Sequence, residues 1–375
     1  MKKIKVMTVF GTRPEIIRLS AVLKKLDRFT EHIMVHTGQN YDYELNEVFF
    51  KDLQLRKPNY FLEVKSDSLG AQIGKIIEKS ETVILNEKPE AFLVLGDTNS
   101  ALSSIIAKRY HIPVFHMEAG NRCFDERVPE ELNRRIVDHI ADINFCYTEN
   151  ARHYLLQEGL APGKIFVSGS PMAEVLDSAI KGINKSSVLS RFKLTRKKYF
   201  VVTCHREENI DNDKNFEIFC DTLNAISEIY KLKIFISMHP RTAKKIAQKN
   251  ISLHKNIIIS KPLGFFDFIK LQQNSFCVIS DSGTIFEESS ILNFTAVVIR
   301  NSAERPEALD TGACIQTGMN REAILSGIEI AVDSFSSSNK WTLPPDYEPL
   351  NVSDRITRFI IGQANIICRK TWGNF

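Results

Sequence analysis

Short runs of Val, Ile, Leu and Phe recur along the whole chain, each followed by a turn signal and then by a segment of helical periodicity. This alternation is typical of β-α units that build a parallel sheet. The runs are Ile4–Phe10, Ile33–His36, Phe92–Leu95, Val114–His116, Ile143–Tyr147 and Ile165–Val167 in the first half, then Tyr199–Thr203, Lys233–Ser237, Ile257–Ile259, Phe276–Ile279 and Val297–Ile299. The sequence therefore predicts an α/β protein with two doubly wound parallel sheets in tandem.

The chain length and the turn residues indicate how this pattern divides into domains. A chain of 375 residues corresponds to about two domains of roughly 100 to 200 residues each. We expect a boundary at Gly169-Ser170-Pro171, where Gly and Pro follow the last strand of the first set. The polar stretch Ser334–Asn339 is expected to be a loop and Ile356–Trp372 a final helix.

Charge and cysteine content exclude several classes of protein. The net charge is 49 − 45 = +4, spread without a run of five like charges, so we expect no nucleic-acid partner. The 7 cysteines are odd in number and include no C-x-x-C pair, which favours reduced thiols, a cytoplasmic location and no zinc site. No apolar stretch approaches the roughly 18 residues of a membrane helix, so no membrane association is expected.

Ligands of open parallel sheets bind beyond the carboxyl ends of the strands, so polar residues there are candidates for chemistry. The first strand is followed by Gly11-Thr12-Arg13-Pro14-Glu15. A well-capped helix would explain the Gly, Thr and Pro, but Arg13 beside a helix N-terminus suggests a phosphate site. Neither a dinucleotide fingerprint nor a P-loop is present.

Acidic residues follow two strands of the first half and open the next helix. Asp97 comes after the third strand, Glu118 after the fourth, and Glu130 with Glu131 opens the next helix. Capping would explain Asp97, and the helix dipole would explain one of the two glutamates. Helix capping does not explain Glu118. Together, these carboxylates therefore indicate acid–base chemistry.

Cations and small residues occupy the equivalent places in the second half. His205-Arg206 follows its first strand, His239 its second, and Asp281-Ser282-Gly283 its fourth. The last of these could present backbone N–H groups to a phosphate, with Glu288 on the next helix accepting ribose hydroxyls, although a capped helix explains it equally well. The run Glu207–Lys214, with its acidic triplet, is expected to be a solvated loop and not a metal site.

The complete ordered set resembles the non-hydrolysing UDP-N-acetylglucosamine 2-epimerases over residues 4 to about 310. The motifs that carry the resemblance are Phe10–Glu15, Gly96–Thr98, His116–Gly120, Pro129–Glu131 with Asn133-Arg134, His205-Arg206, Asp281–Gly283 and Glu304–Glu307. The resemblance implies a glycosyltransferase-B-like fold of two Rossmann-like domains facing a cleft, and a homodimer. It also implies that the final helix returns, so that residues 1–169 and 356–375 form one domain and residues 170–355 a UDP-binding domain.

One loop resembles a narrower branch of that family. Cys123-Phe124-Asp125 stands where the glucosamine branch usually has a Thr-Gly-Asp-type segment, and Asn121 replaces Leu. That branch converts UDP-2-acetamido-2,6-dideoxy-L-talose to UDP-N-acetyl-L-fucosamine for capsule or O-antigen synthesis. The alternative substrate is UDP-N-acetylglucosamine, giving UDP-N-acetylmannosamine, and a glycosyltransferase of the same fold is a further alternative. Arg18 and Glu207 depart from the family's usual Lys and Arg.

The resemblance implies roles for individual residues and no NAD, metal or other cofactor. C2 of the UDP-sugar would invert by elimination of UDP to a glycal-type intermediate and re-addition. Asp97, Glu118 and Glu130 would perform the acid–base steps, with His205 assisting the leaving UDP. The residues expected to bind the substrate are Arg13, Arg18, Arg206, His239, Ser282, Gly283, Glu288 and Arg305.

Overall fold

The computed structural model describes residues 2–38, 43–66, 68–238, 240–249, 251–338 and 340–373. The chain forms two units, Met1–Ser178 with Pro345–Phe375, and Ala179–Pro344. The chain first passes from one unit to the other inside helix α7 (Met172–Lys185). Near the start of this helix, the Glu174 carboxylate accepts a 2.8 Å hydrogen bond from the Ser353 N–H. This bond connects the start of α7 to the C-terminal segment. The boundaries between the units therefore lie at 178/179 and 344/345, whereas the sequence predicts them at 169/170 and 355/356.

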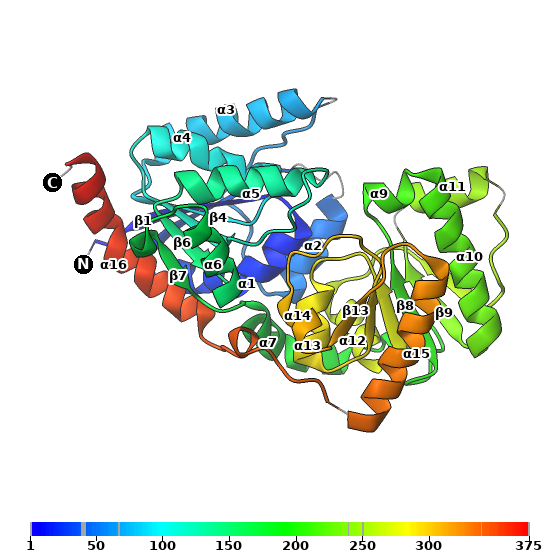
Figure 1. Cartoon of the computed structure of the whole chain (residues 1–375). Coiled ribbons are helices and arrows are strands. Elements are labelled where there is room, and N and C mark those ends of the chain that lie inside the picture. The colour runs from blue at the N-terminus through cyan, green and yellow to red at the C-terminus, as the bar shows by residue number, and fades with distance from the viewer. Residues whose placement is uncertain are drawn as a thin grey trace. The chain divides into compact units, whose positions relative to one another are not determined.

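The first unit contains a seven-stranded sheet in the order β3-β2-β1-β4-β5-β6-β7, and every pairing is parallel (Figure 1). The strand order reverses between β1 and β4, which makes the carboxyl ends of these strands the expected ligand-binding edge. The strands are β1 (Lys5–Phe10), β2 (Glu31–His36), β3 (Tyr60–Phe61), β4 (Ala91–Leu95), β5 (Val114–Ala119), β6 (Ile143–Cys146) and β7 (Ile165–Val167).

Helices cover both faces of this sheet. Buried side chains of α3, α4 and α5 join those of β1, β2 and β4 in one apolar cluster. On the opposite face, Phe359 of α16 packs against Phe145 and Phe166, with ring centroids 5.4 and 4.2 Å away. The helices are α1 (Arg13–Phe29), α2 (Tyr43–Asp52), α3 (Leu69–Glu87), α4 (Ser104–Arg109), α5 (Pro129–Ile140), α6 (Glu149–Gln157) and α16 (Val352–Trp372), with 3-10 turns η1 (Asn99–Ser103), η2 (Pro162–Lys164) and η3 (Pro345–Tyr347).

The second unit contains a six-stranded parallel sheet in the order β10-β9-β8-β11-β12-β13. Its order reverses between β8 and β11, which again marks the ligand-binding edge. Its strands are β8 (Tyr199–Thr203), β9 (Lys233–Ser237), β10 (Ile257–Ser260), β11 (Cys277–Ser280), β12 (Ala296–Val298) and β13 (Cys314–Gln316). Its helices are α8 (Val188–Arg191), α9 (Glu207–Ile210), α10 (Asp213–Tyr230), α11 (Pro240–Gln248), α12 (Phe265–Asn274), α13 (Ile285–Leu292), α14 (Glu307–Asp310) and α15 (Arg321–Ser338).

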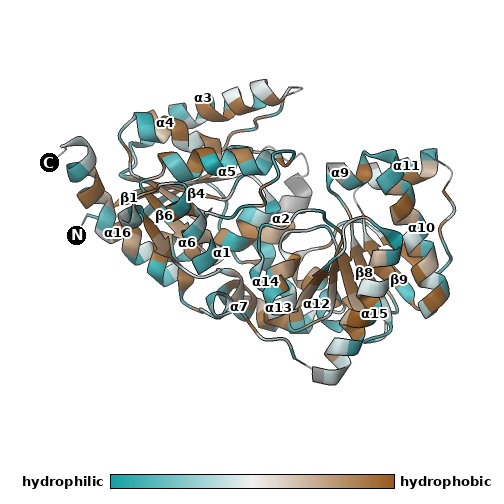
Figure 2. Cartoon of the chain, viewed as in Figure 1, coloured by the Kyte–Doolittle hydropathy of each residue, from teal (hydrophilic) through white to brown (hydrophobic). Residues whose placement is uncertain are grey.

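Two parallel doubly wound sheets confirm the predicted fold class of two Rossmann-like α/β domains. The strands are continuous apolar runs because helices cover both faces: all five residues of β4 are buried. Figure 2 shows strands that are mostly hydrophobic and helices that carry both hydrophobic and hydrophilic residues. Among the described residues, no helix has both the length and the apolar character of a membrane span.

Some local predictions are wrong. The short strands β3 and β13 are absent from the sequence prediction, and the expected loop at 334–338 belongs to helix α15. Buried Ile324 and Ile328 start α15 with helical spacing, and the helix then continues through serines that hydrogen-bond back to carbonyls four residues earlier. The run 207–214 is not a simple loop, because it forms α9 and the start of α10, which Asn212 caps by accepting from the Asn215 N–H at 3.1 Å.

Candidate active site

Helix α1 begins directly after β1 with a capping box. The Glu15 carboxylate accepts hydrogen bonds from the N–H groups of Gly11 and Thr12, at 3.0 and 2.8 Å, and from the Thr12 hydroxyl at 2.8 Å. Burial raises the pKa of Glu15 to about 7, although these hydrogen bonds oppose the rise. Arg13 opens the helix, with its guanidinium 5.9 Å from the centroid of the Phe49 ring. The strand-to-helix junction therefore places a cation at the positive end of the α1 dipole, which suits an anionic ligand.

Glu118 lies at a bulge near the carboxyl end of β5. The pairing of β5 with β6 shifts register between Met117 and Ala119, and Glu118 has φ +63°. A left-handed conformation costs a residue with a side chain about 1–2 kcal/mol, and bulges next to active sites redirect side chains. Here the carboxylate forms an ion pair with Arg18 of α1, and both side chains are only 4 % exposed. The strained backbone thus presents a buried carboxylate to a buried guanidinium.

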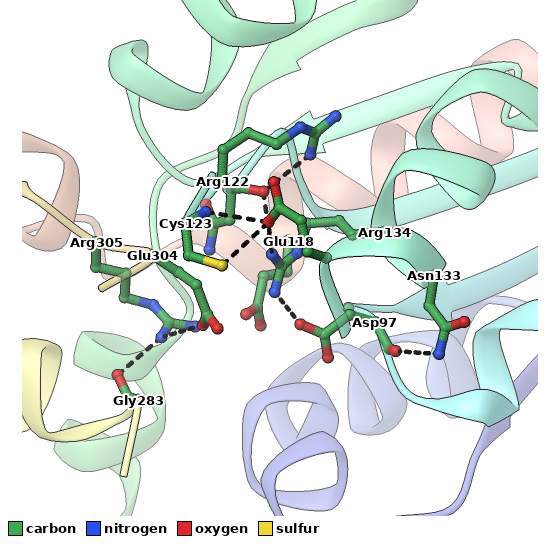
Figure 3. A network of polar contacts seen from close by, with 12 residues as sticks. Asp97, Glu118, Arg122, Cys123, Asn133, Arg134, Gly283, Glu304 and Arg305 are labelled. Carbon is green, nitrogen blue, oxygen red and sulfur yellow. Dashed lines mark hydrogen bonds and ion pairs between the residues drawn. The ribbon is translucent and has the colours of Figure 1, made fainter. Parts of the chain in front are cut away.

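Asp97 follows β4 and is held by helix α5. Arg134 forms an ion pair with its carboxylate, and the Asn133 amide donates to its backbone carbonyl at 2.9 Å (Figure 3). The Asp97 side chain is 17 % exposed. Glu130 lies one turn before Arg134 and is half-buried, and no hydrogen bond or ion pair to it is found within the described ranges. One carboxylate is therefore tightly oriented, while the other is free to meet a ligand.

Glu131, the second glutamate of the Pro-Glu-Glu motif, holds the loop between β5 and α5 in place. Glu131 is buried and accepts from the Cys123 N–H at 3.0 Å and from Arg135 at 3.2 Å. Phe124 has φ +53°, is 64 % exposed, and meets Tyr154 of α6 edge to face at 5.2 Å. The segment that suggested a narrower branch therefore has a strained backbone and an exposed aromatic ring.

In the second unit, Asp281 holds the loop that follows β8. Its buried carboxylate accepts from the N–H groups of His205 and Arg206, both at 2.9 Å, and lies 3.1 Å from Nδ1 of His205. Burial would raise the pKa of Asp281, but His205 and these N–H groups lower it below its ordinary value. Since Nδ1 faces Asp281 and the imidazole is 57 % exposed, Nε2 is available to a ligand.

The turn after β11 is built around Arg305. The Arg305 guanidinium donates to the Gly283 carbonyl at 2.8 Å and forms an ion pair with Glu287 at 3.2 Å. A Cβ on Gly283 would approach Arg305 Nη1 to 2.9 Å, so the close packing favours glycine. The Ser282 hydroxyl lies 3.0 Å from that of Thr284. Arg305 thus supports the turn from within the protein.

Two other predicted contacts have protein partners. Glu288 is buried on α13 and accepts from the Gln272 amide at 2.8 Å. Arg206 is half-buried, with Nη2 4.0 Å from Glu304. His239 lies outside the described residues.

The structure thus brings the predicted residues together in groups within each unit. In the first unit, Arg18 forms an ion pair with Glu118, and Asp97 contacts the helix that carries Glu130. In the second unit, the N–H groups of His205 and Arg206 donate to Asp281, which directly precedes Ser282 and Gly283. From the sequence alone, no role is assigned to the residues that hold these groups in place, although His116 and Arg134 lie within the quoted motifs. They are His116, Arg122, Arg134 and Asp138 in the first unit and Asp281, as a partner of His205, in the second.

The described residues contain no group of three or more His, Cys, Asp or Glu side chains arranged to hold a metal ion. Within each unit, side chains form ion pairs and hydrogen bonds, as Figure 3 shows for Asp97 with Arg134 and Asn133. Carboxylates, a histidine and guanidinium groups suit proton transfer and the binding of a diphosphate.

Comparison with known proteins gives a consistent result. The family model described as UDP-N-acetylglucosamine 2-epimerase matches residues 23–361. The chain is 36 % identical over 338 residues to the UDP-N-acetylglucosamine 2-epimerase of Methanocaldococcus jannaschii, covering 88 % of this chain and 92 % of that protein. It is 35 % identical over 327 residues to the UDP-2,3-diacetamido-2,3-dideoxy-D-glucuronate 2-epimerase of Pseudomonas aeruginosa, covering 86 % and 90 %.

Solved structures agree over nearly the whole chain. A UDP-N-acetylglucosamine 2-epimerase from Rickettsia bellii is 46 % identical, with a TM-score of 0.92 and coverage of 99 % of this chain and 100 % of that one. The M. jannaschii enzyme in complex with UDP-GlcNAc and UDP is 34 % identical, with a TM-score of 0.87 and coverage of 96 % and 99 %.

Proposed function

The chain belongs to the UDP-N-acetylglucosamine 2-epimerase family, and is thus an isomerase acting at C2 of a UDP-sugar; we propose that its substrate is UDP-2-acetamido-2,6-dideoxy-L-talose and its product UDP-N-acetyl-L-fucosamine. The Cys123-Phe124-Asp125 loop supports this choice, because its sequence resembles that branch. Its exposed aromatic ring would suit an apolar group such as the methyl of a 6-deoxy sugar.

The chemistry of C2 requires an indirect route. No adjacent carbonyl acidifies the C2 hydrogen, so simple removal and return of this proton would be very slow. In the proposed reaction a base takes the C2 proton while the bond from C1 to the UDP oxygen breaks, leaving a C1–C2 double bond and free UDP. A proton then adds to the opposite face of C2, and the UDP oxygen re-forms its bond to C1.

The carboxylates of the first unit carry this proposal. We assign Asp97 and Glu130 to the two proton transfers at C2, with Glu118 as the third acid–base group. The support is that Asp97 is oriented by Arg134 and partly exposed, while Glu130 is half-buried on the same helix. Proton transfer to and from carbon needs groups held in position on either face.

The cations and the glycine turn of the second unit would bind UDP and stabilise its departure. His205 would assist the leaving diphosphate through Nε2, and Arg206, His239, Arg13 and Arg18 are proposed as further residues that bind the UDP-sugar. Ser282 and Gly283 would donate hydrogen bonds to phosphate, Glu288 would accept hydrogen bonds from the ribose hydroxyls, and Arg305 would support the turn. We also propose that the enzyme is a cytoplasmic homodimer supplying capsule or O-antigen synthesis.

A second candidate substrate is UDP-N-acetylglucosamine, with UDP-N-acetylmannosamine as its product. The observation that favours it is the shared name of several relatives, including the M. jannaschii and R. bellii proteins. The two candidates share the reaction at C2 and differ only in the sugar that the site accepts.

Proton NMR in D₂O decides between them. Purified enzyme is incubated with each UDP-sugar separately, and we expect deuterium at C2 and a second epimer from the talose derivative at the higher rate. A faster reaction with UDP-N-acetylglucosamine would select the second candidate. Absence of deuterium from both sugars would refute the proposal, and transfer to an acceptor without epimerisation would indicate a glycosyltransferase.

Two variants test the assigned acids. Asp97→Asn and Glu130→Gln are each expected to abolish deuterium incorporation while UDP still binds. Glu126→Gln is the matched control, because Glu126 precedes α5 and is 88 % exposed. Normal exchange in either acid variant would remove that residue from proton transfer.

A further inference from the structure

Asp138 on α5 is a fully buried carboxylate that holds the loop following Glu118. Its two oxygens lie 3.2 and 3.3 Å from the Gly120 N–H nitrogen. It forms an ion pair with Nη1 of Arg122 at 2.8 Å and lies 2.9 Å from Nδ1 of His116, and these three side chains are all 0 % exposed. Asp138 therefore contacts residues on both sides of the strained backbone at Glu118.

His116 connects the same carboxylate to the next strand. Its Nε2 lies 2.8 Å from the carbonyl oxygen of Gly96, the residue before Asp97. Both ring nitrogens thus lie within 3 Å of an oxygen atom, Nδ1 at 2.9 Å from Asp138 and Nε2 at 2.8 Å from Gly96. The Gly96 N–H in turn donates to the Met117 carbonyl at 2.9 Å. One ring therefore joins the carboxyl ends of β4 and β5 to helix α5.

Helix α5 is the common support of the proposed acids. Glu130, Arg134 and Asp138 are spaced four residues apart, which places them on one face of the helix. Arg134 pairs with Asp97, and Asp138 holds the loop after Glu118. A displacement of Asp138 would therefore change the relation of Glu118 to the other two acids.

Arg122 connects Asp138 to a second carboxylate. It donates to both oxygens of Glu158, at 2.7 and 2.6 Å, in addition to its ion pair with Asp138. Burial would raise the pKa of Asp138, but His116 and Arg122 lower it below its ordinary value. On the β6 side the facing groups are Asn144, paired in register with His116, and the Cys146 thiol, whose pKa burial raises. Removing one charge would leave the others buried without compensation.

From this geometry we propose that His116 and Asp138 are positioning residues of the epimerase, which keep Asp97 and Glu118 at a fixed separation and orientation. The proposal rests on the proposed function, because it assumes that these acids act at C2. His116 and Asp138 would not touch the sugar. They would act through the backbone of Gly96 and Gly120, so their loss would lower kcat and leave nucleotide binding intact.

Asp138→Asn is the first test, because it keeps an oxygen acceptor and removes the charge. We expect kcat to fall by up to about 100-fold, because a misplacement of an active group by about 1 Å can cost on the order of 100-fold in rate. The KM for the UDP-sugar and the affinity for UDP are expected to change little. A merely structural residue would lower the amount of folded enzyme without this separation of kcat from KM.

Two substitutions of His116 separate its two contacts. Asn can place an N–H near the position of Nδ1, facing Asp138, whereas Gln can place one near Nε2, facing Gly96. We expect each of His116→Asn and His116→Gln to retain more kcat per folded molecule than His116→Ala, and less than wild type. These variants decide the question if Asp138→Asn does not fold.

Asp142→Asn is the matched control at the other end of β5. Asp142 is 5 % exposed, accepts from the Val114 N–H at 3.0 Å and pairs with Lys108. We expect it to lose stability and keep kcat. Equal kcat in the Asp138, His116 and Asp142 variants would overturn the positioning role. Failure of the wild type itself to incorporate deuterium at C2 would instead refute the proposed function, so the two failures are distinct.

Discussion

Replacing Gly120 by Ala is the most direct test of how the strained loop supports Glu118. Gly120 has φ +78°, and a Cβ at this position would lie 2.4 Å from the carbonyl oxygen of Ala151 and 2.9 Å from Cγ of Leu155. The obstructing oxygen belongs to the backbone of helix α6 and cannot turn away as a flexible side chain would. The loop itself must therefore move.

The size of this effect follows from two terms. A left-handed conformation with a Cβ costs about 1–2 kcal/mol, and overpacking of a dense interior typically costs a further 1–3 kcal/mol or so. We therefore expect Gly120→Ala to lower the free energy of unfolding by roughly 2–5 kcal/mol. Gly159→Ala is the control, because Gly159 has φ +86° with no atom within 4 Å of its Cβ position, so only the first term applies.

The same overlap predicts the effect on activity. A normal C···O contact is about 3.3 Å, so the loop must move by about 0.9 Å, and a misplacement near 1 Å can cost on the order of 100-fold in rate. Urea unfolding and deuterium exchange at C2 measure the two effects on the same samples. We expect Gly120→Ala to lose both stability and kcat and Gly159→Ala to lose stability alone. Equal stability and equal kcat in the two variants would refute the reasoning.

Three further changes test other parts of the structure. Asp281→Asn removes the partner of His205 Nδ1, so we expect kcat to fall about 10- to 100-fold; an unchanged kcat in steady-state assays would show that His205 is oriented by other contacts. The pKa of Glu15 is about 7 in the folded protein and 4.5 as an ordinary glutamate, so its stabilising effect is present below pH 4.5 and is lost as the pH rises through 7. Urea unfolding measures this effect. Between pH 4.5 and 8, the free energy of unfolding of Glu15→Gln should rise by on the order of 3 kcal/mol relative to that of wild type. A difference between the two proteins that does not change with pH would contradict this. Ile360→Ala removes a fully buried side chain of α16 and should cost about 2–5 kcal/mol by denaturation with little change in kcat per folded molecule.

The sequence predicted the sheets well because their strands are buried on both faces. A run such as that of β4 has few alternatives once helical segments flank it, and the ends of such runs identified Asp97 and Glu118 without any structure. The two-residue strand β3 and the three-residue strand β13 are too short to leave a periodic signal. The serines at the end of α15 have low helix propensity, and helix formation there depends on the preceding turns.

Pairing between distant residues was beyond sequence reasoning. Arg18 and Arg305 were expected as cations for an anionic ligand, but each has a carboxylate partner in the protein, Glu118 and Glu287. The partner of Arg18 lies 100 residues away, and only the sheet topology brings the two together. The four-residue spacing of Glu130, Arg134 and Asp138 places them on one face of a helix, but only the fold shows what that face contacts.

The distribution of strain and buried charge argues that this edge of the sheet is shaped for chemistry. Gly96, Glu118 and Gly120 all have positive φ, and the ion pair of Asp138 with Arg122 and the His116 ring are buried beside them. Buried ion pairs contribute little net stability compared with well-packed apolar residues, and strained backbone lowers it. The middle of the same sheet is apolar and carries no such features in β4. The costs at the carboxyl ends of β4 and β5 are therefore best explained by the orientation of Asp97 and Glu118, which is what the Asp138, His116 and Gly120 variants measure.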